Sequence, residues 1–246
     1  MVPLSLLLLT MAFWPASPAR GAPAPTAISF AEQPVRLFRE RAFYIAGRGV
    51  RLQDGDIIET GAAGIQLAAG SATIALGPAS RVAFKLGARP FELILLDGWL
   101  KIQATEPALV SAAGVRLNAA ASSVIVHANA DRIELFVESG APAVDEIQGG
   151  KVLRHTTVMR EQYAVRTEKE PLKPLPRPPK DFLAAMPQVF AEQLVPVALT
   201  GPPPVPKLER QAAFADVAPW LATEPALKQL IQRRYAPRKP APSFSH

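Results

Sequence analysis

Four carboxylates in this chain could support acid–base chemistry. Asp54 and Asp56 flank Gly55 in the segment "DGD", Glu59 follows three residues later, and Asp97 lies in a separate apolar run. A pair of carboxylates can act as general acid and general base, which would make the protein a hydrolase. "DGD" is also typical of a tight turn, because Asp accepts local backbone hydrogen bonds and Gly adopts positive φ. We predict a turn here and keep the hydrolase as an alternative.

The histidines and cysteines give no sign of a metal or cofactor site. His127, His155 and His246 lack the H-x-H or H-E-x-x-H spacing of metal ligands, and the chain has no cysteine. "DGD" lacks the further oxygen ligands of a calcium loop. No G-x-S-x-G nucleophile motif occurs, and "GAAGIQLAAG" lacks the context of a phosphate-binding loop. We predict no catalytic residue, no metal and no cofactor, and therefore a protein that is not an enzyme.

The elements that would position these residues are short runs with strand character. Between residues 27 and 169, apolar side chains alternate with polar or small ones, and Gly, Asn, Asp, Pro or Ser separates the runs. Such spacing is typical of a sandwich, a barrel or a β-helix-like stack, and no fixed period indicates a repeat protein. We predict a mainly β domain over residues 27–169, built as a rolled or stacked double sheet.

A proline-rich segment separates these runs from the C-terminal part of the chain. Five of the ten residues from Pro171 to Lys180 are proline, so this segment should be extended and join neither a helix nor a strand ladder. We predict a linker over residues 170–180 and a small helical tail over residues 181–246. The tail has three candidate helix N-caps, which are Asp181, Asp216 and Thr223. Leu227, Leu230 and Ile231 would form one apolar helix face.

The net charge of +6 belongs almost entirely to the last third of the chain. Residues 171–246 carry ten Lys and Arg against five Asp and Glu, whereas residues 1–170 carry 17 against 16. A basic, proline-rich tail can attract anionic lipids or acidic envelope polymers. No aromatic and basic nucleic-acid motif occurs, so we predict no nucleic-acid partner. The charge favours an alternative function, a structural envelope protein that binds peptidoglycan or lipopolysaccharide through its tail.

The N-terminus has the features of a signal peptide. Leu4–Phe13 is a short apolar run, and Ser17 and Ala19 are the small residues that favour cleavage after Ala19, with residue 24 as the outer limit. The competing interpretations are a retained anchor and a buried apolar segment. No later stretch reaches the ~18 uninterrupted apolar residues of a membrane span. We predict a signal peptide over residues 1–19 and a periplasmic mature chain without a transmembrane segment.

The segment from Val50 to Phe84 resembles the FecR-like periplasmic domain family. The family pattern contains G-D, T-G, G-S and an L-x-P-x-S end, and this chain contains "GDIIETG" followed by "GSATIALGPAS". The residues that match the pattern are Gly55, Asp56, Thr60, Gly61, Gly70, Ser71, Leu76, Pro78, Ser80 and Val82. The usual D-G-S is A-G-S here, and Arg160 replaces a late glycine. The resemblance extends from Arg36 to Arg166.

The resemblance implies an all-β periplasmic module without enzymatic activity. The best-known members of the family are anti-sigma regulators with an N-terminal cytosolic helical domain and one membrane span. This chain has only an apolar leader before the β domain, so we expect a sensor or interaction module without the transmembrane output. The predicted function is an exported, non-catalytic binding and sensing module whose partner is a protein or polymer of the cell envelope.

Overall fold

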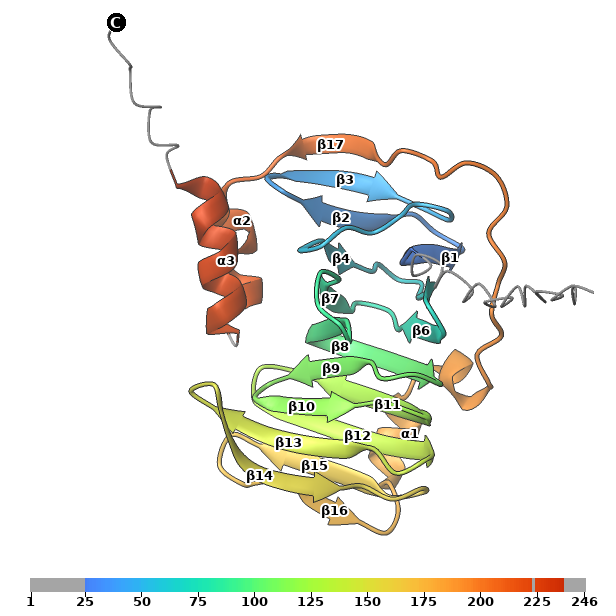
Figure 1. Ribbon diagram of the computed structural model, residues 1–246, viewed down its shortest axis with the longest axis vertical. Coiled ribbons are helices and arrows are strands. Elements are labelled where there is room, and N and C mark those ends of the chain that lie inside the picture. Colours follow the sequence, from blue (N-terminus) through green and yellow to red (C-terminus); the bar gives the residue numbers. More distant parts are fainter. Residues whose placement is uncertain (1–24, 223, 237–246) are drawn as a thin grey trace, which may run out of the picture.

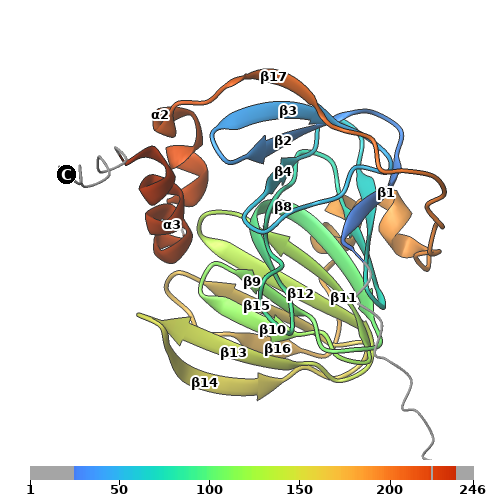
Figure 2. The same ribbon diagram turned by 45° about the horizontal axis from the view of Figure 1, so that its top comes forward.

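The protein folds into two β-sheets that stack face to face, with short helices packed outside them (Figures 1 and 2). A computed structural model describes residues 25–222 and 224–236. The predicted signal peptide, His246 and the candidate cap Thr223 lie outside the described residues. The prediction of a mainly β fold with a double sheet and a small helical C-terminal part is confirmed.

The strands form two ladders. Sheet A contains, in spatial order, β1 (Ala27–Ala31), β5 (Ile65–Ala69), β6 (Ala72–Leu76), the second half of β8 (Glu92–Ala104), β11 (Ser122–Ala128), β12 (Arg132–Ser139), β15 (Tyr163–Thr167) and β16 (Lys173–Leu175). Sheet B contains β17 (Lys207–Gln211), β3 (Ala42–Ala46), β2 (Val35–Arg39), β4 (Ile57–Glu59), β7 (Arg81–Lys85), the first half of β8, β9 (Leu109–Ala112), β10 (Val115–Asn118), β13 (Ala143–Gln148) and β14 (Lys151–Thr157). All pairs are antiparallel except β8–β9.

The long strand β8 joins the two sheets. Residues up to Asp97 pair with β7 in sheet B, and residues from Gly98 onward pair with β11 in sheet A. The pairing register shifts there, because Arg81 lies opposite Asp97 and Val82 opposite Leu95. Leu96 is therefore an extra residue in β8, as expected where a bulge bends a strand. Gly98 has φ +90°, and a Cβ there would meet Ser80 atoms at 2.5–2.8 Å. The chain therefore needs glycine at the corner that makes one sheet into two.

Strict alternation along the strands fills three separate apolar layers. On β2 and β4, Leu37 and Ile58 face the central core between the sheets, whereas Phe38 and Ile57 face a second cluster outside sheet B. On β8 and β11, Leu100 and Val124 face the same central core, whereas Trp99 and Ile125 face a third cluster outside sheet A. Because strand side chains alternate between faces, a sheet with two apolar faces requires a cover on its outer side.

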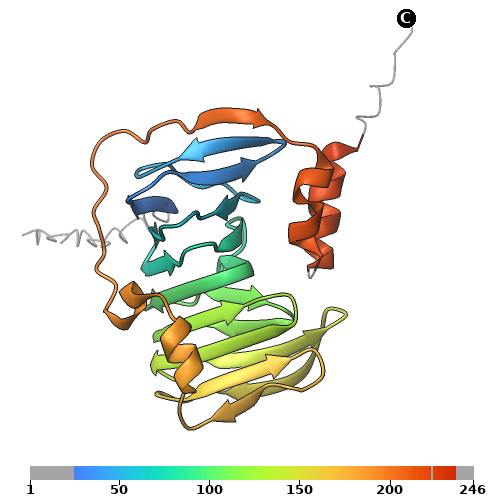
Figure 3. The ribbon, with the colours of Figure 1, turned by 180° about the vertical axis from the view of Figure 1, so that it is seen from behind.

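The C-terminal part of the chain supplies both covers. The helices α1 (Lys180–Ala185) and η1 (Gln188–Ala191) pack outside sheet A, as Figure 3 shows from behind. An extended strap then runs along the side of the sandwich to β17. The helices α2 (Phe214–Val217), η2 (Ala218–Leu221) and α3 (Pro225–Tyr235) follow β17 and pack outside sheet B (Figure 1). No helix among the described residues is long and apolar enough to cross a membrane.

The expectation that the proline-rich segment joins no strand is wrong. Lys173–Leu175 forms β16 and pairs with β15, with Pro174 opposite Ala164. A proline is tolerated there because β16 is an edge strand, whose outer side needs no donor. A strand also replaces part of the predicted helical tail, since β17 pairs with the open edge of β3. Strands from both sides of residue 170 belong to one ladder, and the predicted domain limits stay predictions.

The predicted helix caps are wrong at the two described positions. Asp181 lies in the first turn of α1, whose N-cap is Pro179. Asp216 is the third residue of α2, and its carboxylate accepts hydrogen bonds from the Ala213 amide and from Arg210, both at 2.8 Å. In the last helix, Leu227 and Ile231 are buried and Leu230 is 40% exposed, so the predicted apolar face is narrower than expected.

Candidate functional site

Several residues of the FecR-like pattern form the corner at which β8 changes sheets. Thr60 Oγ1 donates to the Gly77 carbonyl at 2.7 Å and accepts from the Ser80 amide at 2.8 Å. Ser80 Oγ accepts from the Trp99 amide at 2.8 Å and donates to the Pro78 carbonyl at 3.1 Å. Thr60 and Ser80 are buried. Their hydroxyls satisfy backbone groups that the bend removes from the ladders, which is a structural task.

Asp56 holds the preceding turn to strand β2. Its carboxylate receives Arg39 Nε at 2.9 Å and an Arg39 terminal nitrogen at 2.7 Å, and it also accepts the Gln53 amide at 2.8 Å. Gly55 has φ +77°, as the turn interpretation of "DGD" requires. Asp56 is 1% exposed. A two-pronged ion pair of this kind fixes the loop and leaves the carboxylate no free oxygen for chemistry.

The other pattern residues lie at turns or in the core. Gly70, with φ +59°, and Ser71 connect β5 to β6, and Leu76 is buried between the sheets. Gly61 and Pro78 lie in exposed loops that contact each other, because the Ala79 amide donates to the Gly61 carbonyl at 2.8 Å. None of these residues converges with a second chemically active side chain.

The carboxylates of the hydrolase alternative point to different partners. Asp54 Oδ1 accepts the amides of Leu86 and Gly87 at 2.7 and 3.1 Å. Glu59 pairs with Arg81 at 2.8 Å on the outer face of sheet B, and Asp97 lies opposite Arg81 in the ladder. Together with the Asp56–Arg39 pair, these contacts engage three of the four acids separately. Asp54, Asp56 and Glu59 are neighbours in the sequence, but their side chains contact different partners in the structure.

The densest polar network lies elsewhere, on the outer face of sheet A, and sequence reasoning missed it. His127 Nδ1 and the Tyr163 hydroxyl lie 2.9 and 2.5 Å from the two oxygens of Glu134, and Arg132 contacts the same carboxylate at 2.8 Å. The Trp99 ring stacks on His127 with centroids 4.2 Å apart, and Phe182 of α1 packs against Trp99. These residues come from four neighbouring strands, so only the strand register could have revealed the cluster.

The polar groups of this network satisfy one another. Burial opposes the ionisation of Glu134, but the hydrogen bonds from His127 and Tyr163 and the charge of Arg132 outweigh it and hold the pKa of its carboxyl below the usual value. Burial and the hydrogen bond to Glu134 raise the pKa of Tyr163 to about 12. An ionised carboxylate only accepts hydrogen bonds, so His127 and Tyr163 both donate to it. Each member is engaged by another member, and α1 covers the group.

The last described histidine, His155, also lies apart from any metal-like cluster. His155 is exposed on β14 and lies 2.7 Å from Asp145 Oδ1, and the sequence offered no functional role for it. Within residues 25–222 and 224–236, no three His, Asp or Glu side chains gather as a metal site would require.

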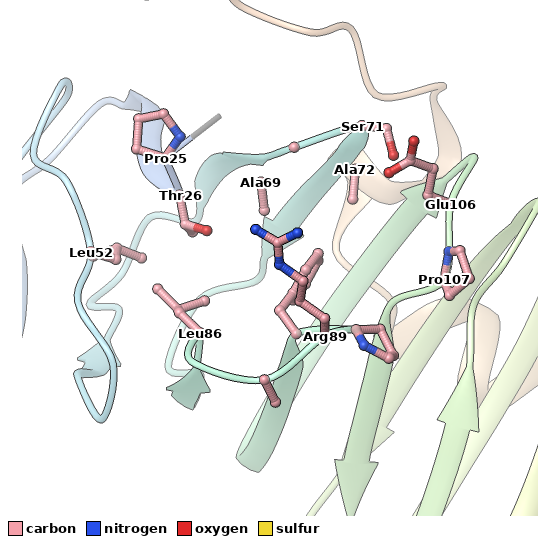
Figure 4. Close-up of a pocket in the computed structure, with 14 residues that line it drawn as sticks. Pro25, Thr26, Leu52, Ala69, Ser71, Ala72, Leu86, Arg89, Glu106 and Pro107 are labelled. Carbon is pink, nitrogen blue, oxygen red and sulfur yellow. The ribbon is translucent and has the colours of Figure 1, made fainter. Parts of the chain in front are cut away.

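An open cleft between the two sheets is the best candidate for a binding site (Figure 4). It has a volume of about 520 Å³ and lies between the β5–β6 turn and the loop that joins β7 to β8. Its apolar walls are Leu52, Ala69, Ala72, Leu86, Phe91 and Pro107. Its charged groups are Arg89 and Glu106, and Thr26 and Ser71 contribute hydroxyls.

The arrangement in the cleft is suited to recognition. Arg89 projects from its loop towards the β5–β6 side, whereas Ser71 and Glu106 lie at the end away from Pro25 and Leu52 (Figure 4). Both charged side chains are exposed and make no ion pair with the described part of the chain. Apolar walls with a few convergent polar groups are typical of ligand sites.

No family model matches the chain, and no curated protein matches it. Two crystal structures, at 2.50 and 1.65 Å resolution, of a "putative anti-sigma factor" from Parabacteroides distasonis ATCC 8503 are similar in part. Each has 9% sequence identity and a TM-score of 0.43, and the match covers 49% of this chain and 59% of that chain. The match therefore spans less than two thirds of that protein.

Proposed function

We propose that this protein is an exported, non-catalytic binding module of the FecR-like type, which engages a protein or polymer of the cell envelope. The observation that carries the proposal is the inter-sheet cleft, whose apolar walls and exposed charges, Arg89 and Glu106, are free to meet a ligand. Asp54, Asp56 and Glu59 and the Glu134 network are instead committed to contacts inside the molecule.

The FecR-like part of the proposal is supported by where the pattern residues lie. Thr60, Ser80 and Asp56 hold the corner and the turn on which the double sheet depends. A pattern that specifies such contacts describes a scaffold, and a scaffold can serve different partners through its loops and clefts. The resemblance therefore supports a fold type and an exported setting, and the cleft supports the binding role.

Photo-crosslinking from the cleft tests this function. A benzoylphenylalanine placed at Ser71 should capture an envelope protein or polymer in living cells, and Arg89→Glu should abolish the adduct. The control position is Leu153 on β14, which is 65% exposed and distant from the cleft in the strand order. N-terminal sequencing of the same protein should start at Arg20. Recovery of cytosolic partners alone, or an adduct that Arg89→Glu leaves unchanged, would refute the proposal.

The structural alternative is binding of peptidoglycan or lipopolysaccharide through the basic tail. Arg210 and Arg234 contact Asp216 and the Gly55 carbonyl within the molecule, whereas Lys207 and Arg233 are exposed. Triple substitution of Lys207, Lys228 and Arg233 by Gln should reduce binding to sacculi or lipopolysaccharide in low salt, since exposed charges act through a screened field. Binding that resists both the substitutions and salt would exclude the tail as the contact.

The hydrolase alternative has a simpler test. The purified protein should hydrolyse ester, amide and glycoside substrates no faster than the Asp54→Ala and Asp97→Ala variants do, and these substitutions should change only the free energy of unfolding. Hydrolysis by the wild-type protein that is lost in a folded Asp54→Ala or Asp97→Ala variant would support the hydrolase alternative.

A further inference from the structure

A second groove lies where the C-terminal segment meets the sheet A side of the molecule. It has a volume of about 510 Å³. One wall comes from the end of β1, the 62–66 segment and residues 75–78, and the other comes from residues 187–195 around η1. The FecR-like pattern contributes Leu76 and Pro78 to the first wall. The groove thus exists only because the tail folds back on the β domain.

Large apolar side chains are exposed in the groove. Phe30 is 45% exposed, Val189 61% and Val195 69%, and all three line it. Ala62 and Ala63 add small apolar side chains to the same surface. Exposed large apolar side chains gathered in one concave surface mark an interaction site more often than single ones do.

The charge of the groove is opposite to that of the chain. Its lining includes two carboxylates, Glu32 and Glu192, and no Lys, Arg or His. Both acids are exposed, and neither forms an ion pair within residues 25–222 and 224–236. Two unpaired acids beside an apolar surface complement a segment that carries apolar side chains and cations.

The tail wall of the groove is held rigidly. Lys101 is 1% exposed, and its Nζ donates to the carbonyls of Phe190 and Glu192, both at 2.7 Å, and to Glu138 at 2.9 Å. Gln66 Nε2 donates to the Val195 carbonyl at 2.7 Å. A wall anchored at Phe190, Glu192 and Val195 costs little further entropy when a ligand binds, which favours recognition.

We propose that this groove binds an apolar segment of a partner protein that is flanked by Lys or Arg residues. The inference rests on the proposed binding function but concerns a surface separate from the cleft of Figure 4. Phe30, Val189 and Val195 would contact the apolar side chains, and Glu32 and Glu192 would pair with the cations.

Peptide binding to the full mature chain tests the proposal. The probe is a fluorescein-labelled decapeptide of alternating Leu and Lys, compared with a decapeptide of alternating Leu and Glu and one of alternating Ser and Lys. Fluorescence anisotropy should give the Leu–Lys peptide an affinity at least about tenfold above the other two, the equivalent of roughly 1.4 kcal/mol. Glu32→Gln combined with Glu192→Gln should lower that affinity about tenfold and flatten its salt dependence.

Matched variants locate the binding surface. Val189→Asp should abolish binding of the Leu–Lys peptide, whereas Val205→Asp, the same change at a 90% exposed residue outside the groove, should leave it intact. Arg89→Glu should also leave peptide binding intact. The binding function proposed for the cleft and the peptide binding proposed for the groove can therefore be refuted independently. Equal binding by the Leu–Glu peptide, or insensitivity to Val189→Asp, would overturn the proposal. Concentration-dependent dimers lost in Val189→Asp would also overturn it, because a second copy would then occupy the groove.

Discussion

The two outer faces of the sandwich are covered by the same tail through different kinds of contact. On sheet A, the short elements α1 and η1 place Phe182 and Phe190 over an apolar patch and are fixed by Lys101, a buried cation surrounded by acceptors. On sheet B, α2, η2 and α3 place Val217, Leu221 and Ile231 over the sheet, and the partly exposed Arg234 donates to the Gly55 carbonyl at 3.3 Å. We call these segments, residues 180–194 and 214–235, cover A and cover B.

The difference follows from what each segment can offer. Cover A has a six-residue helix and a four-residue 3-10 turn, which leave backbone carbonyls without helical partners, and Lys101 satisfies two of them. The longest element of cover B is an 11-residue helix, whose carbonyls are mostly satisfied internally. Aromatic rings at its rim, such as Trp220 over Phe43 and beneath Arg81, extend the contact. Cover A therefore depends on a buried polar anchor, whereas cover B, which also contains two four-residue elements, is held mainly by apolar burial.

The largest expected effect is at the anchor of cover A. Lys101→Met removes the donor to the Phe190 and Glu192 carbonyls and to Glu138, and should cost about 4 kcal/mol of unfolding free energy. Urea denaturation measures the loss, and hydrogen exchange should show that the amides of cover A lose protection and those of cover B do not. The control is Lys85→Met, because Lys85 pairs with Glu92 at 3.0 Å but is partly exposed. It should cost less than about 1 kcal/mol. Similar losses at the two lysines would refute the anchor.

Ile231→Ala tests cover B in the same way. The side chain is fully buried against sheet B, so its truncation should cost about 3 kcal/mol. Leu230→Ala, at the exposed neighbouring position, should cost about 0.5 kcal/mol or less. Hydrogen exchange should now report loss of protection in cover B alone. If cover A opens as well, the two covers form one cooperative unit and the contrast between them fails.

The smallest expected effect is a pH dependence beneath cover A. Burial and the hydrogen bond to Glu134 raise the pKa of Tyr163 to about 12 in the folded state, whereas the pKa of a tyrosine in the unfolded chain is about 10. The unfolded state is therefore favoured as pH rises from about 10 to about 12, and the loss should reach roughly 2 kcal/mol. Urea denaturation at pH 8, 10 and 11.5 measures it. Tyr163→Phe should be less stable at pH 8 but should lose less between pH 10 and 11.5. Parallel slopes in the two proteins would rule out this origin.

The sequence predicted the parts of the fold that depend on local pattern. Alternating runs and intervening glycines indicated the strands of a double sheet, and the turn at Gly55 was predicted because Asp accepts local backbone hydrogen bonds and Gly adopts positive φ. The tail was harder. The strands β16 and β17 were missed because Lys173–Leu175 and Lys207–Gln211 have no strand pattern of their own, and they become strands by pairing with open edges. The caps were missed because backbone context, and not residue type alone, decides which residue begins a helix.

The sequence by itself determined that the chain builds a mainly β scaffold with glycine at its turns and a C-terminal segment of different character. It did so because side-chain alternation and backbone preference are local properties. Only the tertiary structure decided which side chains meet. Strand register brought His127, Glu134 and Tyr163 together, and the return of the tail over sheet A created the acidic apolar groove. Contacts between residues such as Lys101 and Phe190 depend on how distant segments pack, which no local pattern encodes.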